Sequence, residues 1–195
     1  MGQGVCQLQR SLGCEPAWLQ QVHGIEVARA TPGDLVVADA SWSNAPGVAC
    51  AVMTADCLPV LFCDRAGTRV AAAHAGWRGL AAGVLEATLD ALLIAPEETL
   101  IWLGPAIGPQ AFEVGAEVRE AFVSQHPQTL EAFSPSANSG RFMADIYQLA
   151  RIRLAARGVT AVYGGGLCTY SDPRFYSYRN AARTGRFASL IWLAD

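Results

Sequence analysis

The sequence predicts a mixed α/β fold, of the α/β or α+β class, in a single domain. Its 195 residues match the usual size of one domain, and no repeat, low-complexity tract or long Pro/Gly linker divides them. Short segments rich in β-branched and aliphatic residues outnumber the helical patterns and do not alternate strictly with them. Because a doubly wound parallel sheet requires such alternation, we expect a mixed arrangement of sheets.

Eight apolar segments are expected to be strands. Each is short, and Gly, Pro or Asp bounds most of them, which is typical of strands rather than of helices. They cover residues 25–29, 35–40, 48–54, 58–63, 70–74, 99–103, 161–164 and 189–193.

Three further segments have the apolar periodicity of helices. The first is expected to begin at Gly79 and to end before Pro96, and one of its faces is formed by Leu80, Val84, Leu85, Leu89 and Leu92. The second covers residues 115–124. The third begins near Asp145 as its N-cap and ends at Gly158, in the left-handed conformation that follows many helices.

Composition and charge restrict the location and the ligand. The chain is 52% hydrophobic, yet no apolar run approaches the ~18 residues that cross a bilayer, and residues 1–10 lack the pattern of a secretory signal. We therefore expect a cytoplasmic protein, with its six cysteines reduced because no CxxC pair occurs. The net charge of −3 disfavours nucleic acid and membranes as partners. A small-molecule ligand is expected, and the oligomeric state stays open.

The basic residues and histidines exclude several kinds of enzyme. All 14 basic residues are arginine, so Schiff-base chemistry, a lysine general base and a phosphate loop of the GK[ST] type are excluded. Any bound anion must be held by arginine or by backbone amides. The three histidines are too few for the coupled copper centres of a true laccase, but they suffice for one small metal site.

The stretch TADCLPV at residues 54–60 is the first candidate site. Its polar residues interrupt two apolar strand-like runs, which places Asp56 and Cys57 at a strand end or bend, where side chains face a cleft. The alternative is that Cys57 is a small buried hydrophobe, the common fate of a free cysteine.

The stretch HAGWRG at residues 74–79 is the second candidate site. A strand leads into a turn that carries His74 and Arg78 between small residues, and a helix starts at Gly79. The helix N-terminus and Arg78 together would attract an anion such as phosphate. Alternatively, the glycines are turn residues and His74 is a hydrogen-bonded core histidine.

The other two histidines differ in their surroundings. His23 lies on an apolar run directly before a glycine, whereas His126 lies in a polar helix exit, where a solvated role is expected. His23, Cys57 and His74 therefore form a possible His₂Cys set, which leaves a fourth position on a metal open for water or substrate. Their spacing matches no local zinc motif.

The C-terminal part offers further groups for a ligand. Within residues 168–186, Arg179 could form paired hydrogen bonds to a phosphate or carboxylate, and Tyr178 could stack on a base or a sugar. The alternative is a surface loop before the last strand. Residues 134–140 also have the composition of a surface loop.

Five sequence blocks resemble the YfiH family, which has been described as "multicopper polyphenol oxidoreductase (laccase)". They occur in the family's order and cover nearly the whole chain. The blocks are QVHG at residues 21–24, TADCLP at 54–59, HAGWRG at 74–79, GPAIGP at 104–109 and YSYR at 176–179.

The resemblance implies stacked mixed β-sheets flanked by helices, a sandwich similar to that of cysteine hydrolases. It also implies a zinc site whose ligands match His23, Cys57 and His74. The implied activities are phosphorolysis of adenosine, inosine and S-methyl-5′-thioadenosine, and deamination of adenosine; some members are tied to peptidoglycan-precursor editing. Members usually begin with an additional segment that this chain, a single domain at residues 1–195, is expected to lack.

Three functional hypotheses follow. The leading one is a zinc enzyme acting on purine nucleosides, in which Asp56 carries a proton and Arg78, Gly79, Tyr178 and Arg179 hold substrate and phosphate. The second is a metal-free cysteine hydrolase, with Cys57 as nucleophile and His74 as base. The third is a catalytically silent binding domain. Copper-dependent polyphenol oxidation is disfavoured by the small number of histidines.

Overall fold

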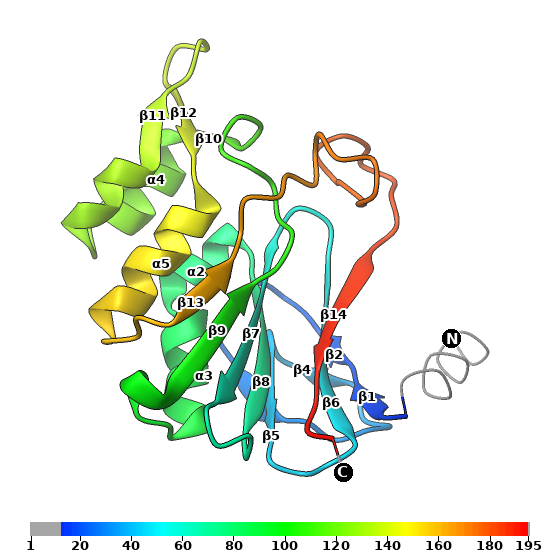
Figure 1. Cartoon of the computed structure of the whole chain (residues 1–195). Helices are drawn as coiled ribbons and strands as arrows, with labels where there is room; N and C mark the ends of the chain where they lie inside the picture. The colour runs from blue at the N-terminus through cyan, green and yellow to red at the C-terminus, as the bar shows by residue number, and fades with distance from the viewer. Residues whose placement is uncertain (1–12, 195) are drawn as a thin grey trace.

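A six-stranded mixed sheet runs through the centre of the molecule (Figure 1). The computed structural model describes residues 13–194. The two outer strand pairs of this sheet are parallel and the inner pairs are antiparallel. In spatial order the strands are β13 (Val162–Gly164), β9 (Thr99–Leu103), β7 (Leu58–Asp64), β8 (Val70–Ala75), β5 (Ala40–Ser43) and β3 (Val27–Arg29).

Three smaller sheets complete the β structure. One of them contains β1 (Glu15–Ala17), β6 (Val48–Thr54) and β14 (Phe187–Ile191), and it lies against β7 and β8 of the central sheet. A two-stranded sheet pairs β2 (Leu19–Gln20) with β4 (Val36–Val37). The last sheet contains β10 (Glu113–Gly115), β12 (Arg141–Ala144) and β11 (Phe133–Pro135).

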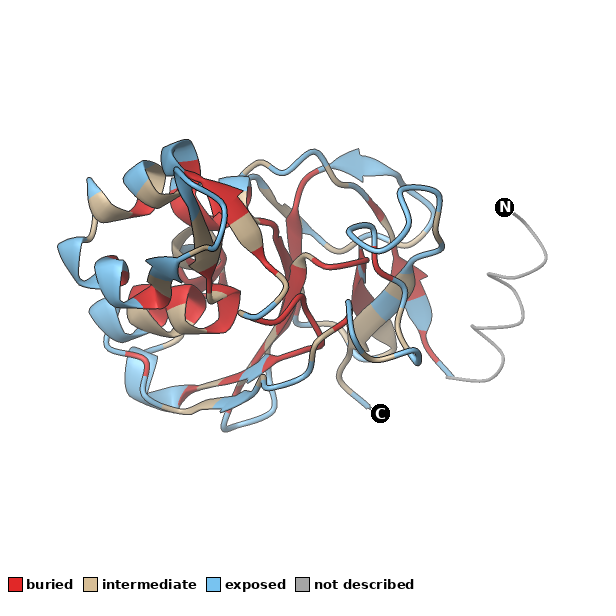
Figure 2. Ribbon diagram, turned by 90° about the horizontal axis from the view of Figure 1, so that it is seen from above, coloured by how far each residue is buried: buried red, intermediate tan, exposed pale blue. Residues whose placement is uncertain are grey.

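Helices cover the other face of the central sheet (Figure 1). They are α2 (Trp77–Ala82), α3 (Val84–Leu92), α4 (Ala116–Val123) and α5 (Ile146–Ala156), with short 3-10 helices η1 (Pro96–Glu98) and η2 (Pro127–Ala132). The main core lies between helices and sheet and includes Leu58, Phe62, Leu85, Ile101 and Leu149. A smaller core separates the central sheet from the β1-β6-β14 sheet. Figure 2 shows the buried residues concentrated along these layers.

The mixed class and two of the three helices are confirmed. The helix expected at residues 115–124 is α4, and the helix expected to start after Asp145 is α5. The Asp145 carboxylate caps α5 by accepting hydrogen bonds from the backbone N–H groups of Tyr147 and Gln148, at 2.9 and 3.0 Å. Gly158 has a φ of +79°, as expected after a helix.

The single strand expected at residues 35–40 is wrong. The segment contains β4 and then, after a break at Ala38 and Asp39, the start of β5 in a different sheet. The backbone N–H groups of Asp39 and Ala40 both donate to the carbonyl of Glu26, at 3.1 and 3.2 Å. This turn points the Asp39 side chain into the molecule, where it is fully buried.

The single helix expected to begin at Gly79 is also wrong. The helix begins at Trp77, and a glycine at position 83 divides it into α2 and α3. Gly83 has a φ of +109°, which an L-amino acid adopts only with strain, and this residue is the C-cap of α2 and the N-cap of α3. Gly79 is therefore a buried residue inside α2 rather than the start of a helix.

Two other expectations concern loops and thiols. Residues 134–135, expected within a loop, belong to β11, and the turn of the β11–β12 hairpin follows them. Cys14, Cys50, Cys57, Cys63 and Cys168 are free thiols, and Cys6 lies outside the described residues. No helix within residues 13–194 has the length and apolar character needed to cross a membrane.

Candidate metal centre and substrate cavity

Three potential metal ligands converge from separate elements. His23 lies in the loop after β2, Cys57 lies in the turn between β6 and β7, and His74 lies near the end of β8. One donor atom from each side chain lies within 4.8 Å of the other two. The Sγ atom of Cys57 and the Nε2 atom of His23 are 3.7 Å apart. The sequence placed these residues at strand ends, and the fold brings those ends together.

Glycines permit this close approach. A Cβ atom on Gly76 would lie 2.7 Å from the His23 ring and 3.1 Å from the Cys57 sulfur. A Cβ atom on Gly79 would lie 2.8 Å from the carbonyl oxygen of Gly24. Both glycines of the HAGWRG block therefore let the β8–α2 turn pack directly on the His23 loop.

Asp39 connects two members of the cluster. Its carboxylate accepts a 2.7 Å hydrogen bond from Nδ1 of His74, and it also accepts bonds from backbone N–H groups of the His23 loop. Sequence reasoning missed this residue. The available signal was a carboxylate directly after the apolar run LVVA, a setting in which an aspartate is expected to have a buried partner.

The electrostatics of the cluster favour a thiolate beside a charged imidazole. Burial by itself raises the pKa of the Cys57 thiol, but hydrogen bonds and positive charge from His23 and His74 outweigh burial and lower that pKa to about 6. Burial by itself lowers the pKa of His74, but hydrogen bonds to Asp39 and Cys57 and their negative charge raise that pKa to about 9. A thiolate is the form in which cysteine binds metals or attacks a substrate.

The donor set fits a metal ion. Two imidazoles and one thiolate are common ligands of transition metals, and a site with three protein ligands leaves room for water or substrate. The bond between His74 Nδ1 and Asp39 leaves Nε2 of His74 as its free donor atom. His126 lies apart, as the N-cap of η2, and the metal-ligand cluster found in residues 13–194 does not include it.

A cavity of about 610 Å³ opens beside the cluster. Its lining includes the predicted residues His23, Asp56, Cys57, His74, Arg78, Tyr178 and Arg179. It also includes groups that sequence reasoning missed, among them Gln21, Trp77, Phe112 and Arg186. Gln21 and Trp77 lie inside the QVHG and HAGWRG blocks, and Arg186 ends the polar stretch 168–186, but nothing local assigned these residues a role. Their place at the cavity is revealed by the fold.

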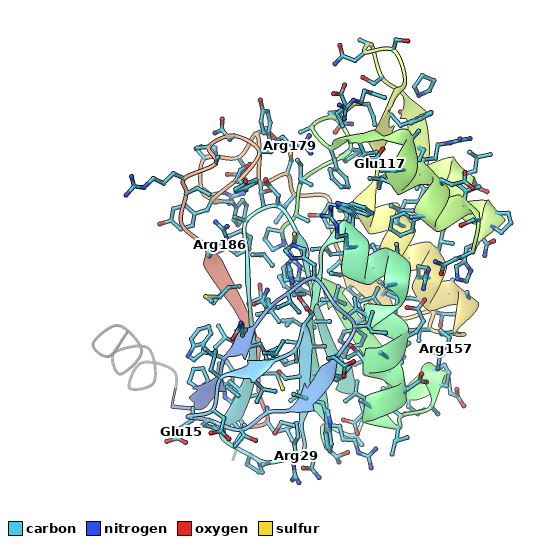
Figure 3. All side chains as sticks on the ribbon, turned by 180° about the vertical axis from the view of Figure 1, so that it is seen from behind. Glu15, Arg29, Glu117, Arg157, Arg179 and Arg186 are labelled. Carbon is cyan, nitrogen blue, oxygen red and sulfur yellow. The ribbon has the colours of Figure 1, made fainter. Side chains whose placement is uncertain are left out.

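Four of the lining residues form what we call the rim: Arg78, Tyr178, Arg179 and Arg186. All four are exposed. The guanidinium of Arg78 lies over the Trp77 ring, 4.5 Å from its centroid, and that of Arg186 lies 5.9 Å from the Tyr178 centroid. Figure 3 labels Arg179 toward the end of the molecule opposite Glu15 and Arg29, with Arg186 between them.

Asp56 anchors the rim to the turn that carries Cys57. Its Oδ1 accepts a 2.7 Å hydrogen bond from the Thr169 hydroxyl, and its Oδ2 accepts a 2.6 Å bond from the backbone N–H of Arg179. Asp56 has a φ of +92°, a strained value for a residue other than glycine. Both carboxylate oxygens thus hold the C-terminal loop. The role of Asp56 as a proton carrier stays a prediction.

Arg179 is held both at its backbone N–H and at its guanidinium. Its backbone N–H is bound by Asp56, and its Nη1 donates to the carbonyls of Ala111 and Glu113 at 3.3 and 3.1 Å. The guanidinium also lies near the Phe112 ring, 5.8 Å from its centroid. The remaining N–H groups of the guanidinium stay available for an anion in the cavity.

Comparison with known proteins adds independent information. Residues 3–194 match the family model described as "Multi-copper polyphenol oxidoreductase laccase". The chain is 70% identical over 190 residues to purine nucleoside phosphorylase PA4543 of Pseudomonas aeruginosa, covering 97% of this chain and 78% of that protein. It is 58% identical over 186 residues to purine nucleoside phosphorylase YfiH of Escherichia coli, covering 94% of this chain and 76% of that protein.

A solved structure shares the same fold. The crystal structure of Neisseria meningitidis protein NMB0706 superposes with a TM-score of 0.94 at 52% sequence identity. The match covers 97% of this chain and 79% of that one. The arrangement of mixed sheets and helices described above is therefore that of its structural neighbours.

Proposed function

We propose that this chain, which belongs to the YfiH family, is a purine nucleoside phosphorylase holding one zinc ion. The family model is described as multi-copper polyphenol oxidoreductase laccase, and relatives in the family are named purine nucleoside phosphorylase. The observation that carries the proposal is the cluster of His23, Cys57 and His74 at a cavity that arginines also line.

The spacing of the donor atoms supports zinc. With Zn–S and Zn–N bonds of about 2.3 and 2.05 Å and a tetrahedral angle, the sulfur and nitrogen ligands would be about 3.6 Å apart. The Cys57 Sγ and His23 Nε2 atoms are 3.7 Å apart. Zinc bound there would supply Lewis-acid chemistry, which activates water for hydrolysis.

The rim supports binding of phosphate beside a nucleoside. In phosphorolysis, a phosphate oxygen attacks C1′ of the ribose, the bond from C1′ to the purine nitrogen breaks, and its electron pair leaves with the base. Arg78 and Arg179 are our candidates for holding the phosphate through charge-assisted hydrogen bonds, with Arg186 beside them. Tyr178 and Trp77 offer aromatic faces for the base or the sugar.

The proposed substrates are adenosine, inosine and S-methyl-5′-thioadenosine, together with inorganic phosphate. A cavity of about 610 Å³ lies within the usual range for small-molecule sites. We also propose hydrolytic deamination of adenosine, because a metal centre with an open position adjoins the same cavity. Gly79, predicted to bind phosphate, packs against Gly24 inside α2, so we assign the anion to the arginines instead.

The test is a product analysis with and without phosphate. The zinc-loaded chain is incubated with adenosine, and adenine, inosine and hypoxanthine are separated by chromatography. Adenine and hypoxanthine should require phosphate, whereas inosine should not. His74→Ala should abolish all three products, and His126→Ala should leave them unchanged, because His126 lies outside the cluster. Absence of turnover in the unmodified chain would instead support a silent binding domain.

A metal-free cysteine hydrolase is the second candidate. It is favoured by the low pKa of the Cys57 thiol, about 6, and by the chain of contacts from Cys57 through His74 to Asp39. Such an enzyme does not require His23. Metal analysis of protein purified without added zinc separates the two candidates, because stoichiometric zinc that is lost in His23→Ala supports the zinc enzyme.

A further inference from the structure

Asp39 is fully buried, and its carboxylate accepts four hydrogen bonds within the metal centre. Oδ1 accepts from Nδ1 of His74 at 2.7 Å and from the backbone N–H of His23 at 2.9 Å. Oδ2 accepts from the backbone N–H groups of Val22 at 3.0 Å and Gly24 at 2.6 Å. One side chain therefore binds both histidine segments, although β8 and the His23 loop are far apart in sequence.

His74 is held by Asp39 at two points. Its ring donates to the carboxylate, and its backbone N–H donates to the carbonyl oxygen of Asp39 at 2.7 Å. In the neutral form that binds a metal, a carboxylate acceptor at Nδ1 keeps the ring proton on that nitrogen, so the lone pair on Nε2 faces the cluster. Asp39 thus determines both the orientation and the tautomer of His74.

Asp39 also stabilises the backbone conformation of the His23 segment. His23 has a φ of +62°, a left-handed conformation that non-glycine residues adopt at an energetic cost. Three consecutive backbone N–H groups, from Val22 to Gly24, point at the same carboxylate. These charge-assisted bonds offset the cost and present the exposed His23 ring toward Cys57, 3.7 Å from its sulfur.

We propose that Asp39 is the positioning residue of the metal centre, which sets both histidine ligands in place before the metal binds. It does not belong to the donor cluster itself. Since a ligand that is already oriented loses less freedom on binding, removal of this carboxylate should weaken the metal site without removing a ligand. This inference rests on the proposed function only in that the site binds zinc.

The test compares Asp39→Asn with Asp64→Asn as a matched control. Asp64 is also a buried carboxylate, and it accepts hydrogen bonds from the backbone N–H groups of Thr68 and Arg69 and from the Thr68 hydroxyl, outside the cavity. Zinc affinity of the full chain is measured by competition with a chromophoric chelator, without nucleoside present. Asp39→Asn should weaken zinc binding by about 10- to 100-fold, and Asp64→Asn should leave it within about twofold.

A zinc affinity of Asp39→Asn within twofold of that of the unmodified chain would overturn the proposal. Should the variant fail to fold, the ring nitrogens of His74 in the unmodified, zinc-loaded chain provide a second measurement by ¹⁵N NMR. A protonated Nδ1 and a metal-bound Nε2 are expected, and metal bound through Nδ1 would overturn the proposal. Because zinc affinity is measured without turnover, an inactive chain that binds zinc would count against the proposed phosphorylase alone.

Discussion

The metal centre and the rim each depend on one buried aspartate, Asp39 in the first and Asp56 in the second. Asp39 joins a loop to a strand of the central sheet, and the groups that it orients are potential metal ligands. Asp56 joins the Cys57 turn to Thr169 and Arg179 in the C-terminal loop, and the side chains beyond it are exposed. Both aspartates serve as anchors, but only Asp39 acts directly on the cluster.

This difference separates the candidate metal centre from the proposed substrate-binding rim. Cys57 directly precedes β7, and His74 lies near the end of β8 opposite Pro59. Because these two antiparallel strands are mostly buried, the core fixes the relative position of Cys57 and His74. The rim instead comes from a long loop and a helix end, where side chains can change without disturbing the core. Substitutions in the centre should therefore remove metal and turnover together, whereas substitutions in the rim should change substrate affinity and leave the metal bound.

The largest effect is expected for Cys57→Ala. Loss of the thiolate removes one of three ligands, so zinc content should fall from about one ion per chain to near zero, and turnover should fall by at least about 100-fold. Cys63→Ala is the matched control, because Cys63 is a free thiol on β7, away from the cavity. Elemental analysis and product chromatography check both variants. Full zinc occupancy in Cys57→Ala would contradict a centre built on this thiolate.

A smaller effect is expected for Arg179→Gln, which tests the rim. The substitution keeps the backbone N–H that Asp56 binds and removes the guanidinium. Since a hydrogen bond to a charged group contributes about 1.5–3 kcal/mol, KM for phosphate should rise roughly 10- to 100-fold with zinc content unchanged. Arg174→Gln is the control, because Arg174 lies in the same loop but pairs with Asp172. An unchanged KM would remove Arg179 from the phosphate site.

Asp56→Asn should have a moderate effect that distinguishes an anchor from a proton carrier. An asparagine retains one oxygen, so one of the bonds to Thr169 and Arg179 is weakened and the rim loosens. If Asp56 is an anchor, KM should rise about 10-fold while kcat changes little. If Asp56 is a proton carrier, kcat should instead fall by at least about 100-fold, and the pH profile should change. Steady-state kinetics across pH separates these outcomes.

The sequence predicted the members of the His23, Cys57 and His74 cluster better than the groups that support it. His23, Cys57 and His74 could be recognised because each lies at a strand end beside small or polar residues. The role of Asp39 could not be predicted, because its partners are three backbone amides and one imidazole that only the folded chain brings together. The same residue explains the wrong strand at residues 35–40, since the turn that buries it separates β4 from β5.

The rim was predicted in part for a similar reason. Arg78, Tyr178 and Arg179 lie in dense polar stretches, which local composition can identify. Gln21 and Arg186 lie in the same kinds of stretch, QVHG and residues 168–186, but local composition does not show which polar side chains of a stretch face a cavity, and the fold brings these two to it. Gly83 shows the same limit in the helices, because a glycine inside a helical pattern is usually tolerated and its φ of +109° depends on the packing around it.

The smallest effect on the site is expected at the opposite end of β7, where Asp64 ends the strand that Asp56 and Cys57 precede. Burial raises the pKa of Asp64, but hydrogen bonds from Thr68 and Arg69 outweigh burial and hold that pKa below its ordinary value of 3.8. A lowered folded-state pKa contributes stability above about pH 4, and this contribution is lost as the pH falls through the folded-state pKa.

Asp64→Asn should therefore lower Tm by a few degrees at pH 6, and the difference should vanish near pH 2. Thermal unfolding measured by circular dichroism at several pH values checks this, and zinc affinity and KM should stay unchanged. Should Asp64→Asn weaken zinc binding as much as Asp39→Asn, the centre would depend on the general stability of the sheet rather than on the contacts of Asp39.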